Sequence, residues 1–268
     1  WGAPYTNPSA ALGTPDLTQN VPDLFSGGTQ IAFADNSAIT PFNASYNPTN
    51  VVAIQGAGGT ITLQLSSPVI IGSGAQLGFH AAVGLQDALF PNGQNLNPAA
   101  TYTDPRQADL QVSADGVKWV DLGEQAFSSP TNIFSDETDP TGATPGKVQA
   151  NFFQPFSGSL ASFNGADFSQ TLGILNGSAG GSWFDVSGVA LSDIDFVRLS
   201  TADGEKMFLD SVLALSGTTG TVPPPPVTPP PTPTPPPPVS SVPLPGALAM
   251  AATLAPLATL ALRRRRLY

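Results

Sequence analysis

A proline-rich segment near the C-terminus limits how much of this chain can form a folded core. Of the residues from 217 to 241, 12 are proline, and the others are threonine, valine, serine and glycine. Proline has no backbone N–H and a fixed φ, so such a segment stays extended in polyproline II and cannot bury a core. At about 3.1 Å per residue it reaches up to roughly 80 Å. We therefore expect a folded domain over 1–216 and an extended linker over 217–241; the alternative role of this linker is a Pro-rich ligand for a partner domain.

An uncharged apolar run and four arginines follow the linker. The run over 246–262 would span roughly 25 Å as a helix, which is near the lower limit for crossing a bilayer core of about 30 Å. The arginines Arg263, Arg264, Arg265 and Arg266 come next. Because basic residues beside a span stay on the cytoplasmic side, we expect a single transmembrane helix over 246–262, with residues 1–245 across the membrane from the cytoplasm. The alternative is an apolar core helix with a solvated basic end.

The residues before the apolar run form a short proline-containing motif: Val242, Pro243, Leu244 and Pro245. With the apolar run and the arginines, this motif resembles the PEP-CTERM class of sorting tails over residues 242–268, most closely the VPLPA-CTERM variant. The resemblance implies an exosortase-type transpeptidase as the partner that recognises the motif and cuts near it. It also implies an exported bacterial protein that is first anchored in the inner membrane and then reaches the cell surface or the extracellular matrix. Because the sequence begins at Trp1 and not at methionine, we expect either a processed product, which a signal peptide once preceded, or a trimmed chain.

The composition favours short strands over helices in the folded domain. Charged residues make up 10% of the chain, which contains 27 glycines and 29 prolines. Few charges and many turn-forming residues are typical of strands joined by loops. Before residue 217 lie all 19 acidic residues but only five basic residues, a net charge of −14. Such an acidic domain repels nucleic acid and anionic lipid surfaces, so we expect no nucleic-acid partner.

Short apolar and alternating runs predict roughly eight to ten strands. In the clearest run, over 60–65, Ile61, Leu63 and Leu65 share one face, and we expect Ser66-Ser67-Pro68 to end the strand. The other runs lie at 29–34, 51–54, 69–71, 76–80, 108–113, 117–122, 148–153, 194–200 and 207–215.

The dipeptide Asp115-Gly116 between two alternating runs predicts a hairpin. In this hairpin we expect Val117 and Trp119 to pack across from Leu110 and Val112.

Many short strands with long loops predict an all-β fold, an antiparallel β-sandwich of jelly-roll type. Four segments add to this prediction, at 11–16, 112–119, 195–199 and 208–212. In these segments the chain resembles the discoidin or galactose-binding-like sandwiches of exported surface proteins. Such sandwiches often hold one structural Ca²⁺ between an N-terminal loop and the last strand, which implies Asp16 and Asp210 as ligands. Carboxylates and loop carbonyls are the hard oxygen ligands that suit Ca²⁺.

The sequence carries no recognisable catalytic motif, so we expect a protein that is not an enzyme. There is no cysteine and one histidine, His80, whose strand context favours a structural or surface role over a place in a triad. Motifs such as G-x-S-x-G, the P-loop and H-E-x-x-H do not occur. A polysaccharide-active enzyme is kept as an alternative because paired carboxylates can cleave glycosides; the pairs considered are Asp193 with Asp195, and Asp136, Glu137 and Asp139.

Three aromatic residues in or beside predicted loops, Trp183, Tyr102 and Phe153, are candidates for stacking on sugar rings. Packing in the core is the alternative for each ring. The leading functional prediction is an exported surface or matrix protein associated with exopolysaccharide or biofilm. The alternative is a carbohydrate-binding module, with or without Ca²⁺.

Overall fold

The computed structural model describes residues 11, 15, 17, 37–45, 51–55, 58–102, 106–202 and 205–217. The chain divides into two compact units, residues 1–226 and 227–268, and every described residue belongs to the first unit. No helix among the described residues is long and apolar enough to cross a membrane. The predicted features that lie outside the described residues are the strand at 29–34, Asp16, the linker beyond Gly217, Val242–Pro245, the run 246–262 and Arg263–Arg266.

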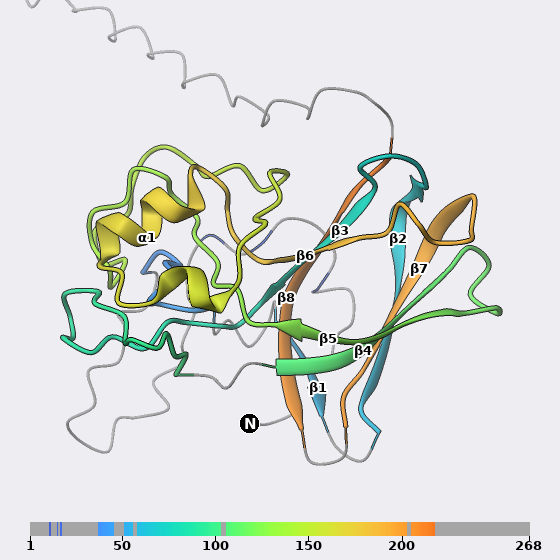
Figure 1. Ribbon diagram of the computed structural model, residues 1–268, viewed down its shortest axis with the longest axis horizontal. Coiled ribbons are helices and arrows are strands. Elements are labelled where there is room, and N and C mark those ends of the chain that lie inside the picture. Colours follow the sequence, from blue (N-terminus) through green and yellow to red (C-terminus); the bar gives the residue numbers. More distant parts are fainter. Residues whose placement is uncertain are drawn as a thin grey trace, which may run out of the picture. The chain divides into compact units, whose positions relative to one another are not determined.

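Two four-stranded antiparallel sheets form a β-sandwich (Figure 1). The first sheet has the strand order β1-β8-β3-β6 and the second has the order β2-β7-β4-β5. The predicted antiparallel β-sandwich is therefore confirmed. The strands are β1 (Val52–Gln55), β2 (Thr60–Ile70), β3 (Gln76–Ala81), β4 (Arg106–Ser113), β5 (Val120–Phe127), β6 (Ser182–Asp185), β7 (Asp193–Ser200) and β8 (Lys206–Leu215).

The core lies between the facing sides of the two sheets. Ile61 and Leu63 of β2 are buried there, as their alternation predicted. Three phenylalanine rings join the sheets: the centroids of Phe79 and Phe127 are 5.3 Å apart, and those of Phe127 and Phe184 are 5.2 Å apart, both pairs edge to face. Because a shift by one residue would turn these side chains outward, the apolar core fixes the register of the strands.

The hairpin between β4 and β5 forms as predicted, but two of its side chains point elsewhere. Leu110 and Val112 lie in the core, whereas Val117 is 78% exposed. Val120 pairs with Val112 and begins β5, so alternation places Trp119 on the opposite, outer face of the sheet. The expected packing of Val117 and Trp119 against Leu110 and Val112 is therefore wrong, because the turn is longer than the sequence pattern suggested.

The strand β2 continues to Ile70, although Ser66-Ser67-Pro68 was expected to end it. It pairs only with β7 and is an edge strand of its sheet. An edge strand tolerates proline because the missing N–H has no neighbouring strand to bond.

Segments before and between the strands form a second structure, which we call the helical lobe: residues 37–45, 82–102 and 128–181 (Figure 1). It contains the 3-10 helix η3 (Leu160–Phe163), the helix α1 (Phe168–Leu175) and an apolar cluster of its own. The strand expected at 148–153 is wrong, because only isolated bridges form there, at Gln149 and Asn151.

A capping box explains where α1 begins. Asp167 accepts a hydrogen bond from the backbone N–H of Gln170 at 2.8 Å, and the Gln170 side chain accepts one from the N–H of Asp167 at 2.9 Å. Together these bonds satisfy two donors at the helix start. The helix ends at Leu175 and is capped by Asn176, whose φ of 49° is left-handed, a conformation that asparagine tolerates at a helix C-terminus.

Candidate functional site

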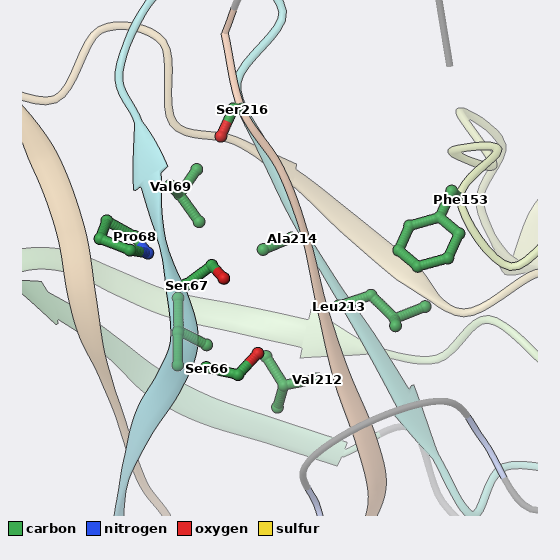
Figure 2. A pocket seen from close by; sticks show the side chains of 10 residues that line it. Ser66, Ser67, Pro68, Val69, Phe153, Val212, Leu213, Ala214 and Ser216 are labelled. Carbon is green, nitrogen blue, oxygen red and sulfur yellow. The ribbon is translucent and has the colours of Figure 1, made fainter. Parts of the chain in front are cut away.

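A groove of about 450 Å³ opens between β2 and the second half of β8 (Figure 2). Its lining is mainly apolar, contains three serine hydroxyls and contains no charged side chain. The lining residues are Leu65, Ser66, Ser67, Pro68 and Val69 on β2, Val212, Leu213 and Ala214 on β8, Ser216 just after β8, and Phe153 from the helical lobe.

The groove exists because β1 is shorter than β8. β1 pairs with β8 only from Lys206 to Leu209, whereas β3 pairs with the other side of β8 as far as Leu215. Among the described residues, no strand lies beside Ser211–Leu215 on the β1 side. Val212 and Leu213 point to opposite faces of β8, and both line the groove. The groove therefore follows the β1 side of this part of β8 and not one of its faces.

The opposite wall is an irregular part of β2. Gln64 pairs with Phe196 and Val69 pairs with Ile194, so four residues of β2 lie opposite one residue of β7. This excess pushes residues 65–68 away from the regular ladder, as at a β-bulge.

One end of the groove is closed by contacts between the two strands. The Ile70 N–H donates to the Ser216 hydroxyl oxygen at 3.2 Å, and the Gly217 N–H donates to the Ile70 carbonyl oxygen at 2.8 Å. These two bonds join β2 of one sheet to the end of β8 in the other.

The structure places one of the three predicted stacking residues in the groove. Phe153 lies at the rim, facing Leu213 of β8 (Figure 2). The backbone N–H of Phe153 donates to Asn151 Oδ1 at 3.0 Å, which fixes the turn that carries the ring.

The other two rings lie away from the groove. Trp183 covers Gly78, where an added Cβ would come within 2.6 Å of the indole, and its Nε1 donates to the Gly180 carbonyl oxygen at 3.0 Å. The Tyr102 ring lies against Gly84, and its hydroxyl oxygen accepts the N–H of Ala44 at 2.6 Å. Trp183 and Tyr102 therefore have packing roles, and Tyr102 is still 39% exposed.

The predicted Ca²⁺ ligands are only half described. Asp210 is buried on β8, at the point where the pairing with β3 shifts register, and Asp16 lies outside the described residues. Among the described residues, no group of three or more His, Cys, Asp or Glu side chains could hold a metal ion. The Ca²⁺ site stays a prediction.

The loop carboxylates considered for glycosidase chemistry hold their own loop together. Asp136 accepts the N–H groups of Lys147 and Val148, both at 2.8 Å. The backbone donor of Val148, and then that of Lys147, hold the pKa of Asp136 below its usual range. Glu137 accepts the N–H of Thr138 at 2.9 Å, and Asp139 accepts further N–H groups of the same loop.

The second pair of carboxylates considered for glycosidase chemistry, Asp193 and Asp195, lies on β7, at the start of the strand.

The single histidine is fully buried between β3 and the helical lobe. His80 Nδ1 lies 3.2 Å from the Thr131 hydroxyl, and Nε2 has no hydrogen-bond partner among the residues that the structure describes. Burial lowers the pKa of His80 to about 3, because the charged imidazolium would lose its hydration. The structural role considered for His80 agrees with this position.

The groove itself was not predicted from the sequence. Its only visible signal was the interruption of an alternating strand by Ser66-Ser67-Pro68. A scan against protein-family models gives no match, and the search of curated proteins gives no significant match either.

Proposed function

We propose that this chain is an exported, non-enzymatic bacterial surface or matrix protein, sorted through its C-terminal tail and associated with exopolysaccharide or biofilm. The observation that carries the proposal is the order of Val242–Pro245, an uncharged run and Arg263–Arg266. The position of the last strand supports it, because β8 ends at Leu215, directly before the proline-rich linker. In this proposal the sandwich is of jelly-roll type, and the linker holds it away from the membrane.

The tail acts by arresting export in the inner membrane. Residues 246–262 form the transmembrane helix, and Arg263–Arg266 stay on the cytoplasmic side. An arginine at the centre of a membrane helix costs roughly 2.5 to 3.5 kcal/mol, so four of them oppose passage of the C-terminus. The exosortase-type transpeptidase then cuts near Val242–Pro245 and releases the folded domain to the surface or matrix.

The test is the mass of the mature C-terminus, measured by mass spectrometry on protein recovered from cells. We expect a C-terminus near residues 242–245 in the wild type. Replacement of Arg263–Arg266 by glutamine should leave the protein uncut or mislocalised. The matched control replaces Lys118 and Lys147, two exposed cations of the domain, and should be processed normally. An uncut wild type with a cytoplasmic domain would overturn the proposal.

A further inference from the structure

The outer face of the sheet β2-β7-β4-β5 carries a row of hydrogen-bonding side chains that crosses all four strands. The cross-strand pairs are Thr62 with Arg198, Arg198 with Gln111, and Gln111 with Asp121. The residues on either side of each member pack in the core, so the four side chains share the outer face. Because neighbouring strands lie about 4.8 Å apart, the row is roughly 14 Å long.

Arg198 is held in place in the middle of this row. Its guanidinium carbon lies 3.7 Å from the centroid of the Trp119 ring, and its Nε donates to the Thr62 hydroxyl oxygen at 3.1 Å. Arginine has five N–H donors, and the described residues provide no partner for the four donors on its terminal nitrogens. Since the stacking on Trp119 fixes the guanidinium plane, a ligand that accepts from these donors orders the side chain little further.

The positions around Arg198 supply acceptors. Asp121 ends the row, and Asp109 pairs with Glu124 on the adjacent strands β4 and β5; all three carboxylates are exposed. The amide of Gln111 both donates and accepts hydrogen bonds. Donors and acceptors side by side are complementary to the hydroxyl groups of a sugar, each of which also donates and accepts. The three carboxylates and the net charge of −14 before residue 217 disfavour a polymer that carries negative charge.

We propose that this outer face binds a neutral polysaccharide, whose hydroxyl groups bond to Arg198, Gln111 and Asp121, while Trp119 positions Arg198. The inference rests on the proposed association with exopolysaccharide and names the surface and the class of sugar. Thr62 and Asp121, at the two ends of the row, are exposed and lie on the edge strands β2 and β5. A long sugar chain can therefore continue past the sheet on both sides.

The probes are four neutral hexasaccharides, cellohexaose, laminarihexaose, maltohexaose and mannohexaose, with hexagalacturonate as the anionic counterpart. Binding to the full chain, kept in a detergent without a sugar headgroup, is measured by calorimetry. We expect at least one neutral hexasaccharide to bind and hexagalacturonate to bind more weakly. The absence of binding by all four at millimolar concentration, or equal or tighter binding of hexagalacturonate, would overturn the proposal.

Variants of the row test where the hexasaccharide binds. Arg198→Gln should weaken binding at least tenfold, because it removes a charged hydrogen-bond donor. Arg198→Lys keeps the charge but loses the stacked plane, and it should also weaken binding. The matched control Lys147→Gln removes an exposed cation of the helical lobe and should bind as the wild type does. Urea unfolding verifies that each variant is folded. Equal binding by Arg198→Gln and the wild type would contradict the proposal.

Two other outcomes would assign the sugar or the face differently. Ser67→Trp fills the groove beside β8, so loss of binding in this variant but not in Arg198→Gln would place the sugar in the groove. A dimer in sedimentation that Arg198→Gln dissociates would assign the face to a second copy of the chain. Either result would overturn the inference. Failure to bind by a chain whose C-terminus is cut near 242–245 would leave the sorting proposal intact, whereas binding by a chain that is never cut would contradict sorting alone.

Discussion

The two sheets share one core but differ on their outer faces. The outer face of β2-β7-β4-β5 is open to solvent, where Thr60, Thr62 and Gln64 of β2 are exposed. The outer face of β1-β8-β3-β6 is covered, so that His80 on β3 and Ser211 on β8 are fully buried although both are polar. His80 pairs with Ser211 across the strands, and Trp183 covers Gly78 on the same face.

This difference shows when an alternation of polar and apolar residues in the sequence predicts which side chains of a strand are buried. On β2 the exposed and buried residues alternate from Thr60 to Gln64, as in a sheet with one solvated face. On β3 five consecutive residues, from Leu77 to Ala81, are buried. A polar residue in a covered strand therefore marks contact with the lobe, and the predictions below test that contact first.

The largest expected effect is acid destabilisation through His80. Its pKa is about 3 in the folded protein, against an ordinary value of 6.5. Between these two values the unfolded chain binds a proton that the folded chain does not, so stability is full above pH 6.5 and falls as the pH drops toward 3. From pH 7.5 to pH 4.5 we expect a loss of about 3 kcal/mol, measured by urea unfolding.

The variant His80→Gln separates this effect from that of the carboxylates. It should be less stable than the wild type at pH 7.5 but almost independent of pH down to 4.5. The pKa values of Asp115, Asp136 and Asp185 are also lowered. These carboxylates therefore also make stability fall as the pH drops, but only at pH values below the ordinary carboxylate pKa. A folded-state titration of His80 near pH 6.5 by NMR would contradict the expectation.

A smaller effect is expected where Trp183 of β6 covers Gly78 of β3. Gly78→Ala places a methyl group within 2.6 Å of the Trp183 ring and should cost about 1 to 3 kcal/mol, as overpacking usually does. The same substitution at Gly173 in α1 meets no atom within 4 Å and should stabilise the protein by about 0.5 to 1 kcal/mol. Thermal unfolding of both variants compares them directly. Equal effects would mean that the Trp183 ring does not pack tightly on Gly78.

The smallest effect is expected on the open face of β2-β7-β4-β5. The Arg198 guanidinium carbon lies 3.7 Å from the centroid of Trp119, and Arg198 Nε donates to the Thr62 hydroxyl oxygen at 3.1 Å. A cation–π pair at such a site contributes about 0.5 to 1 kcal/mol. A double-mutant cycle with Arg198→Ala and Trp119→Ala should return a coupling of that size. A coupling energy larger than the stability lost in Gly78→Ala would reverse the ranking of the two faces.

The sequence predicted the parts of the fold that depend on local pattern. β7 and β8 were predicted because each combines β-branched and aromatic residues over eight or ten positions. α1 was missed because it has only eight residues, too few for a clear helical period, although Asp167 and Gln170 form a recognisable capping box.

The groove and the burial of His80 depend on which strands are neighbours. No local pattern indicates that β1 ends after covering four residues of β8, or that the helical lobe lies on β3. Phe153 was predicted as an exposed ring beside a loop, and the structure places it in the groove; its ligand could not be inferred from the residue type alone.

The bonds from Ile70 to Ser216 and Gly217 have a mechanical consequence. They lie where the chain leaves the sandwich, so tension applied through a tethered C-terminus acts on them first. Beyond them, the pull runs along β8, which is hydrogen-bonded to β3 over most of its length and to β1 at its far end. Hydrogen bonds in an antiparallel pair lie across the strand direction, so this force loads them together in shear, and the domain resists extraction better than if its last strand could be peeled off bond by bond.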